Sequence, residues 1–388
     1  MLHTLLGGLV ALLIAGCAGV PTPRPADCPV CPGVEPAKPA EKPLQPGAWS
    51  DLPGWTEDDP RAALAAFRTS CRSLEKRDVW RATCAELRAL GDPEPAELRA
   101  WFEKRLRPWQ LVQPDGAREG LITGYYEPLL RGSRTRKPPY VHAAYAPPED
   151  MIVVELGELY PDLKHMRLRG RLEGRRLVPY WSRADWSGQE IRHLDKVLLW
   201  LDDPVDFFFM QIQGSGQVVL DDGTRVRLGY ADQNGHPYRS IGRWLLDQGE
   251  LKPGQASMQN IKAWAQANPQ RLSELLNANP SLVFFRELPA EGSGPPGAMG
   301  LALSPERSIA VDPRIVPLGA PVWLATTWPN EDRPLQRLML AQDTGGAIRG
   351  AVRADFYWGT GAEAGALAGR MRQRGSMWVL MPLDYAPK

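Results

Sequence analysis

Turn-forming residues interrupt this chain at short intervals. The 388 residues include 37 Gly and 38 Pro, nearly a fifth of the sequence, and both residue types bend or end regular elements. This spacing favours short strands joined by turns over a bundle of long helices. The length allows two domains of typical size with a real hydrophobic core. We therefore expect a mainly β, β-rich α+β protein.

The charge balance argues against one broad class of ligand. There are 46 basic and 45 acidic side chains, which leave a formal net charge of +1. This balance provides neither the positive field that attracts nucleic acid nor a polybasic patch for membranes, so we do not expect a nucleic-acid partner. Fourteen Trp is a high count. Such residues usually lie in a core, but they also serve as stacking faces in sugar-binding grooves.

The N-terminal segment predicts export. An apolar run from Leu5 to Ala15 is too short to span a bilayer as a permanent helix. It ends in small residues followed by Cys17 and resembles a bacterial lipoprotein signal, although His3 stands where such signals normally carry Lys or Arg. We expect residues 1–16 to be a signal peptide and Cys17 to be lipidated, which places the folded part outside the cytoplasm. The alternative is an ordinary hydrophobic N-terminus.

The remaining cysteines fall into two pairs. Residues 17–48 are rich in Pro and Ala and predict an extended tether. Cys28 and Cys31 lie inside this tether, where a small oxidised loop or two exposed thiols are the expected states. Cys71 and Cys84 lie on two neighbouring helical patterns, and in an oxidising compartment we expect them to form a disulfide across a helical hairpin.

Hydrophobic periodicity predicts the other elements. Helices are expected at 60–74, 78–90, 94–106, 240–248, 257–267, 270–276 and 362–374. Strands are expected at 121–128, 207–213, 218–220, 225–230, 299–303, 308–312, 321–327, 335–342 and 377–381. The turn at 221–224 predicts a hairpin between two of these strands.

Several kinds of chemistry find no support in the sequence. The five His show no metal-ligand spacing, so we expect no metal and no cofactor. There is no phosphate-binding loop and no nucleophile elbow. Ser215 lies between two glycines in a motif that favours a turn over a nucleophile, because no nearby base accompanies it.

The segment from 341 to 361, AQDTGGAIRGAVRADFYWGTG, is the most informative. Asp343 follows a β run, and Asp355 lies twelve residues later, directly before three aromatic residues. Two strands joined by the Gly-rich loop would bring the carboxyls together, and aromatic neighbours would raise a carboxyl pKa. A carboxylic acid that stays protonated near neutral pH is what cleavage of a glycosidic bond requires. Spacing alone favours structural roles for both aspartates.

This segment resembles the 3D motif of the membrane-bound lytic murein transglycosylase A family. Further stretches resemble the family in the same order: TGYYEP at 123–128, DFFFMQIQGSG at 206–216, GYADQNGHPYRSIGRWL at 229–245, NPSLVFFRE at 279–287 and MGLALSPERSIAVDPRIVPLGAPVWL at 299–324. Together they cover most of residues 120–388 and are far more specific than the 3D pattern alone.

The resemblance implies a fold. It predicts a double-psi β-barrel built from the second part of 49–139 and from 289–388, with a helical region before it. A second β-rich domain at 140–288 would be inserted between the two parts, and the glycan would lie in a groove between the domains.

The resemblance also implies a reaction. Family members cleave the β-1,4 bond between N-acetylmuramic acid and N-acetylglucosamine without water and leave a 1,6-anhydro end, with exolytic action expected. Asp355 would be the single acid and then base, and Asp343, with the amides near Gly345 and Gly346, would position it. The groove would be lined by Thr123, Tyr125, Tyr126, Gln211, Gln213 and Ser215, each of which fits a buried strand position equally well. Trp358 fits a core position slightly better than a sugar platform.

Two other functions stay open. A hydrolase on the same scaffold would use Asp343 to activate water, and a non-catalytic wall-binding lipoprotein would need neither aspartate. Ala18 after the cysteine lacks the aspartate that commonly retains lipoproteins at the inner membrane, so we expect the periplasmic face of the outer membrane. The expected partners are peptidoglycan glycan strands and the membrane, with proteins of cell-wall synthesis or division as further candidates.

Overall fold

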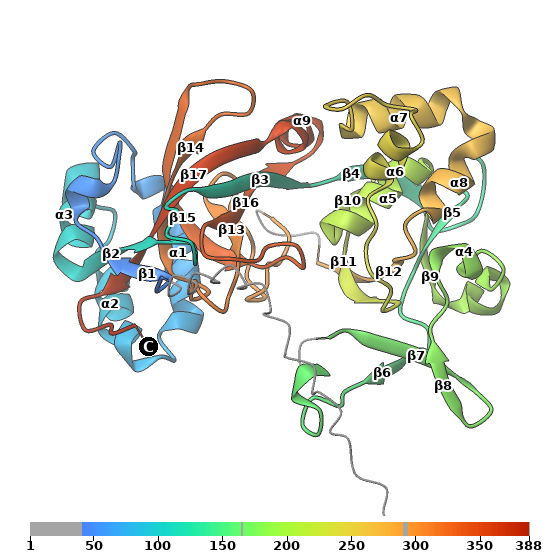
Figure 1. Ribbon diagram of the computed structural model, residues 1–388, viewed down its shortest axis with the longest axis horizontal. Helices are drawn as coiled ribbons and strands as arrows, with labels where there is room; N and C mark the ends of the chain where they lie inside the picture. Colours follow the sequence, from blue (N-terminus) through green and yellow to red (C-terminus); the bar gives the residue numbers. More distant parts are fainter. Residues whose placement is uncertain (1–40, 164–165, 290–293, 388) are drawn as a thin grey trace, which may run out of the picture. The chain divides into compact units, whose positions relative to one another are not determined.

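Strands dominate the computed structural model, which describes residues 41–163, 166–289 and 294–387 (Figure 1). In this part of the chain the strands form sheets of eight, six and three strands, and helices lie between them in the sequence. The expected β-rich α+β class is confirmed.

Six strands of the largest sheet close into a barrel. Around the ring the order is β17–β14–β15–β13–β16–β3, and β3 pairs back with β17. The bounds are β3 (Gly120–Glu127), β13 (Ser308–Val311), β14 (Pro321–Thr327), β15 (Pro334–Asp343), β16 (Arg353–Thr360) and β17 (Arg372–Pro382). β2 (Leu106–Leu111) and β1 (Leu44–Pro46) extend the sheet from β17. The double-psi topology stays a prediction.

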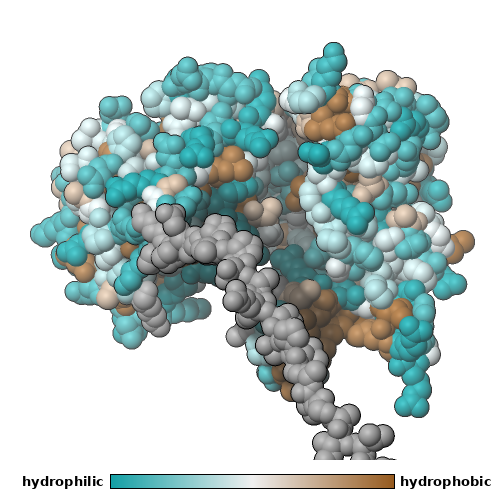
Figure 2. Space-filling model, viewed as in Figure 1, coloured by the Kyte–Doolittle hydropathy of each residue, from teal (hydrophilic) through white to brown (hydrophobic). Residues whose placement is uncertain are grey.

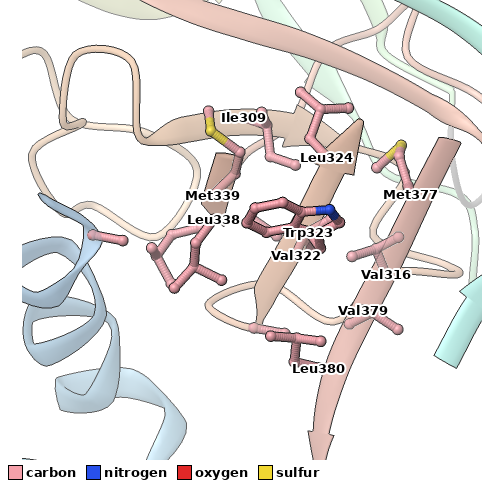
Figure 3. Packing of buried hydrophobic residues seen from close by; sticks show 14 of the residues in the cluster. Ile309, Val316, Val322, Trp323, Leu324, Leu338, Met339, Met377, Val379 and Leu380 are labelled. Carbon is pink, nitrogen blue, oxygen red and sulfur yellow. The ribbon is translucent and has the colours of Figure 1, made fainter. Parts of the chain in front are cut away.

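A large apolar cluster stabilises the barrel. Trp323 on β14 is fully buried and lies among side chains of β13, β15 and β17 (Figure 3). Its indole nitrogen donates to the carbonyl oxygen of Pro53 at 3.1 Å, so the buried ring leaves no polar atom unsatisfied. Burying one such large side chain contributes about 1.5–3 kcal/mol. This cluster makes the barrel a rigid support for the residues on its surface.

Three helices precede the barrel strands and pack on them (Figure 1). They are α1 (Arg61–Leu74), α2 (Asp78–Ala89) and α3 (Pro95–Arg105). A disulfide joins Cys71 on α1 to Cys84 on α2, as expected for the helical hairpin. Gln342 of β15 donates to the carbonyl oxygen of Ala66 and the hydroxyl of Ser70, which ties α1 to the barrel.

The second sheet is inserted between β3 and β13. Its order is β12–β11–β10–β4–β9–β5. The bounds are β4 (Leu129–Ser133), β5 (His142–Tyr145), β9 (Val197–Leu201), β10 (Ser215–Leu220), β11 (Arg225–Gln233) and β12 (Val283–Leu288). Only Pro128 separates β3 from β4, so the chain enters this sheet at Leu129, earlier than the boundary expected at residue 140.

Smaller elements complete the inserted part. The three-stranded sheet consists of β6 (Ile152–Val154), β7 (Leu168–Glu173) and β8 (Arg176–Pro179). The helices are α4 (Arg183–Trp186), α5 (Pro204–Gln213), α6 (Ile241–Asp247), α7 (Met258–Ala267) and α8 (Leu272–Asn277), and α9 (Ala362–Arg370) follows β16. Short 3₁₀ helices span Trp49–Asp51, Pro161–Leu163, Glu190–Lys196 and Pro269–Arg271.

One face of the molecule can be judged by its hydropathy. Hydrophilic residues cover most of the face seen in Figure 2. Of the helices in the described ranges, none has the length and apolar character that crossing a membrane requires.

The strand expected at 207–213 is wrong. These residues form most of the helix α5. Asp203 caps its N-terminus by accepting from the backbone amides of Val205 and Asp206, and Pro204 occupies the first helical position. Gly214 ends the helix in a left-handed conformation with φ of 79°. The capping signals therefore outweigh the strand preference of the aromatic run.

Three smaller expectations also differ from the structure. Residues 299–303 form a turn with a single bridge between Pro296 and Ala302, because Gly300 adopts a φ of 68°. The helix expected to reach residue 374 ends at Arg370, since Arg372 already pairs with Thr123 in the barrel. The end of the expected tether forms β1, which pairs with β2. Cys17, Cys28 and Cys31 lie outside the described residues.

Candidate active site

Strand register brings Asp355 to the surface of the barrel. Asp355 on β16 pairs with Ala310 on β13 and with Thr123 on β3. Side chains alternate along a strand, and its neighbours Ala354 and Phe356 are buried in the barrel cluster. Asp355 and Thr123 therefore lie on the side opposite the core. The Thr123 hydroxyl donates to Asp355 Oδ1 at 2.7 Å.

A β-bulge brings Asp343 to the same site. Ile309 on β13 pairs with Ala341, but Ala310 pairs with Asp343, so Gln342 is the extra residue. The Gln342 side chain is buried against α1, where its oxygen accepts from the Ser308 hydroxyl. Ala310 thus lies opposite both aspartates, one on each neighbouring strand. Bulges often re-aim a side chain beside an active site in this way.

Three donors hold the Asp343 carboxylate. The backbone amides of Thr344 and Ala298 donate to Oδ1 at 2.9 and 3.0 Å, and the Tyr125 hydroxyl donates to Oδ2 at 3.0 Å. Tyr125 lies two residues after Thr123 and on the same side of β3. The amides of Gly345 and Gly346, expected to act with Asp343, make no hydrogen bond to it; the Gly345 carbonyl accepts from Ile348.

Both carboxyls are harder to ionise than usual. Burial raises the pKa of Asp343 to about 6, although its three hydrogen bonds lower it and the Asp355 charge raises it further. Burial also raises the pKa of Asp355, opposed by the Thr123 hydroxyl and the Arg353 charge. Loss of hydration destabilises the charged form of an acid, and two close carboxyls titrate as a pair. The site can therefore hold a proton at a pH where an exposed aspartate has lost it.

The aromatic neighbours of Asp355 do not all face it. Phe356 and Trp358 lie in the barrel cluster, with ring centroids 4.5 Å apart, so Trp358 is a core residue as expected. Tyr357 lies on the side of Asp355, and its ring centroid is 5.2 Å from that of Tyr125. The aromatic shielding expected around the acid is therefore provided by these two tyrosines.

A buried ion pair next to the site links β3 to the inserted sheet. Glu127 lies two residues after Tyr125 on β3 and is fully buried. Arg227 Nε on β11 donates to Glu127 Oε1 at 2.8 Å. Gln217 Nε2 on β10 and the Thr360 hydroxyl both donate to Oε2 at 2.9 Å. Each Glu127 oxygen therefore has a partner, and the cluster joins the two largest sheets.

The other expected groove residues have structural contacts. Gln211 is buried on α5 and accepts from Arg183. Gln213 Oε1 accepts from the backbone amide of Tyr126 at 3.3 Å, and the Tyr126 hydroxyl contacts Met258 Sδ at 3.2 Å. Ser215 begins β10 opposite Gly229. Of the expected residues, Thr123 and Tyr125 thus contact the aspartates directly.

Sequence reasoning missed Asp312, which fixes the loop between the two aspartates. Its side chain is buried and accepts from the backbone amide of Gly350 at 2.9 Å and from Arg314. The bond to Arg314 lowers the pKa of Asp312 to about 2, so it stays ionised. An Asp that directly follows a β run, as in SIAVDPR, is the signal that would have found it.

The described ranges contain no group of three or more His, Cys, Asp or Glu side chains arranged to hold a metal ion.

Asp343→Asn is expected to stabilise the protein at alkaline pH. A carboxyl whose folded pKa is raised costs stability as pH rises from its ordinary pKa through the folded value. For a rise from 3.8 to about 6, this cost is about 3 kcal/mol at pH 8 and absent at pH 3. Asn retains an oxygen for the two amides, and the Tyr125 hydroxyl can turn to accept from its NH2. Urea unfolding at both pH values should show the gain at pH 8 only; a pH-independent difference would contradict the assignment.

Two family models match the chain. The MltA specific insert domain matches residues 121–286, and the 3D domain matches residues 307–381. The membrane-bound lytic murein transglycosylase A of Escherichia coli (strain K12) is 32% identical over 310 residues, which cover 78% of this chain and 75% of that protein.

Solved structures resemble the whole described fold. The lytic transglycosylase LtgG of Burkholderia pseudomallei is 47% identical, with a TM-score of 0.63 over 89% of this chain and 97% of that one. A monoclinic crystal form of MltA from Neisseria gonorrhoeae is 38% identical, with a TM-score of 0.77 over 91% and 99%. E. coli MltA with bound chitohexaose is 28% identical, with a TM-score of 0.66 over 90% and 96%.

Proposed function

Since this chain belongs to the membrane-bound lytic murein transglycosylase A family, we propose that it is a lytic transglycosylase of peptidoglycan. Its substrate bond is the β-1,4 link between N-acetylmuramic acid and N-acetylglucosamine. The observation that carries the proposal is the pair of carboxyls with raised pKa on one side of the barrel, Asp343 and Asp355. A relative with bound chitohexaose supports a sugar chain as ligand.

In the proposed mechanism Asp355 serves as acid and then as base. Its carboxylic proton passes to the oxygen that leaves C1 of muramic acid as the glycosidic bond breaks. The resulting carboxylate takes the proton of the 6-hydroxyl of the same sugar as that oxygen bonds to C1. The 1,6-anhydro ring forms, no water is consumed, and Asp355 regains its proton. Ionised Asp343 stabilises the positive charge that develops at C1.

Product mass tests this proposal. Purified sacculi incubated with the protein should release muropeptides that are lighter by one water than hydrolytic products. Products with a reducing end would instead assign water activation to Asp343 and make the protein a hydrolase. Binding to sacculi with no soluble product, unchanged by Asp355→Ala, would indicate a wall-binding lipoprotein. We also propose exolytic action, which predicts disaccharide-sized products from the earliest time points.

We further propose that Cys17 is lipidated and holds the enzyme at the periplasmic face of the outer membrane. The E. coli relative is named as membrane-bound, which supports an association with a membrane. Cys17→Ala should release the protein from the membrane fraction while the soluble form still cleaves sacculi. If the variant stays in the membrane through an uncleaved segment, the lipoprotein proposal is wrong.

A further inference from the structure

Three arginines lie on the same side of the barrel as Asp355, opposite the core. Arg353 precedes Asp355 by two residues on β16 and pairs with Leu121 on β3. Arg374 on β17 pairs with the same Leu121, and Arg372 pairs with Thr123. Paired residues project to the same side of a sheet, and residues two apart on a strand do so as well. The three arginines therefore share one side of three adjacent strands with Asp355.

They are also close to the acid. A strand advances by about 3.3 Å per residue, and neighbouring strands lie about 4.8 Å apart. The Cα atom of Arg353 is therefore about 7 Å from that of Asp355, and the Cα atom of Arg372, two strands away, is about 10 Å from it. An extended arginine side chain covers the shorter of these distances and most of the longer one. A substrate held at Asp355 comes within their reach.

The protein itself neutralises only part of this charge. Arg353 donates to the backbone oxygens of Leu121 and Ala354, and burial lowers its pKa. Arg374 Nε lies 3.5 Å from Glu119, with both side chains mostly exposed. Across the ranges that the structure describes, neither Arg353 nor Arg372 has an Asp or Glu oxygen within 4.0 Å. The charge of Arg372 is therefore available to an anionic ligand, whereas Arg353 also interacts with the Asp355 carboxyl and Arg374 pairs with Glu119.

A cleft opens beside these arginines. Its volume is about 520 Å³, and its lining includes Leu121, the acidic residues Asp115 and Glu119, and Arg374, which is the one of the three arginines that lines it. Pockets of this size hold small organic ligands or short peptides. Leu121 is 38% exposed, so the wall next to the arginines presents an apolar contact to such a ligand. Leu121 in the wall of the cleft lies two residues before Thr123, the residue of β3 that pairs with Asp355.

We propose that Arg353, Arg372 and Arg374 bind the carboxylates of the peptide carried by muramic acid, and that the cleft beside Leu121 holds this peptide. The proposal rests on the proposed function and specifies its substrate. N-acetylglucosamine carries no charge, and the lactyl carboxyl of a peptide-bearing muramic acid is tied up in an amide bond, whereas the attached peptide carries free carboxylates. Guanidinium groups bind carboxylates in bidentate geometry, which suits them to this ligand. The enzyme then prefers glycan strands that still carry peptides.

The first test measures cleavage. Glycan strands are compared with the same strands after an amidase has removed their peptides. This treatment leaves one lactyl carboxylate on each muramic acid, so the comparison isolates the carboxylates of the peptide itself. The wild type is expected to show a higher kcat/KM on peptide-bearing strands, and Arg372→Gln/Arg374→Gln should lower the ratio of the two values by roughly tenfold. Arg81→Gln, an exposed arginine on α2 that pairs with Asp78, is the matched control and should keep the wild-type ratio. Equal losses on both substrates would overturn the proposal.

The second test does not depend on turnover. The stem peptide that the amidase releases is titrated into the wild type and the double variant by calorimetry. We expect binding that weakens with added salt and is lost in the variant. If the wild type cleaves sacculi but does not bind the peptide and shows no substrate preference, this proposal fails and the proposed function stands. If no substrate is cleaved, the proposed function fails, and the titration alone decides whether the arginines bind the peptide.

Discussion

Asp355→Asn is expected to lower the turnover of sacculi by at least roughly 10²–10⁴-fold. Asn has the size of Asp and still accepts the hydrogen bond from the Thr123 hydroxyl, but it has no carboxylic proton to give and cannot take one back. In the proposed mechanism one residue performs both proton transfers, so one substitution removes both. Binding of glycan strands should persist, because the shape of the site is unchanged. The measurement is the rate of muropeptide release, with glycan binding measured in parallel.

The comparison with Asp343→Asn separates the proposed mechanism from hydrolysis. If Asp343 positions Asp355 and stabilises charge, its loss should lower activity less than loss of the proton donor. If Asp343 activates water, its loss should lower activity about as much. Asp247→Asn, an exposed aspartate on α6, is the matched control and should retain wild-type activity. Near-normal turnover in Asp355→Asn would show that the acid lies elsewhere.

The pH dependence follows from the same two groups. Asp355 must start protonated, so kcat/KM should fall as pH rises through the raised pKa of that carboxyl. The pair must also carry one negative charge to stabilise the positive charge at C1, so activity should also fall at low pH, where both carboxyls are protonated. Because Asp343 and Asp355 titrate as a pair, the loss of activity at high pH and the loss at low pH both belong to the pair. Asp343→Asn should remove the loss at low pH.

Local signals predicted part of the fold but not α5. Helix and strand patterns located the three N-terminal helices and β3, β13, β14 and β15 within a few residues, but they located only the second half of β17 and gave no strand at 353–360, where β16 lies. The aromatic run at 207–213 favours a strand when considered alone, but the capping residues Asp203 and Gly214 at its ends make it a helix. Terminal residues decide such cases, since they satisfy the backbone groups that a helix leaves open.

The geometry of the site depends on pairing between strands that lie far apart in the sequence. Residue spacing suggested that Asp343 and Asp355 meet, but favoured structural roles for both. The bulge at Gln342 and the placement of both aspartates opposite Ala310 depend on strands far apart in the sequence. The family resemblance supplied the missing step by matching Thr123 and Tyr125, which the structure places on the two carboxyls. Arg372 and Arg374 gave no sequence signal, because only the pairing of β17 with β3 brings them near Asp355.

The second large effect is expected at Glu127, where one substitution disturbs a buried ion pair. Glu127 is fully buried and accepts hydrogen bonds from Arg227, Gln217 and Thr360. In Glu127→Gln an NH2 group replaces one of the two oxygens that accept hydrogen bonds. This donor group then faces the donor groups of the neighbouring side chains. The negative charge opposite the Arg227 guanidinium is also lost. Removing one partner of a buried pair typically costs about 3–5 kcal/mol, and we expect a loss in this range.

A matched surface pair provides the control. Glu331 Oε2 accepts from Arg333 Nε at 3.0 Å, but both side chains are more than half exposed. Glu331→Gln makes the same chemical change in water and should cost less than about 1 kcal/mol. Urea unfolding of both variants at neutral pH gives the two losses. Because Glu127 joins β3 to β10 and β11, its variant should also unfold in two steps if this cluster couples the sheets. Equal small losses and a single transition would mean that apolar packing alone holds the inserted sheet to the barrel.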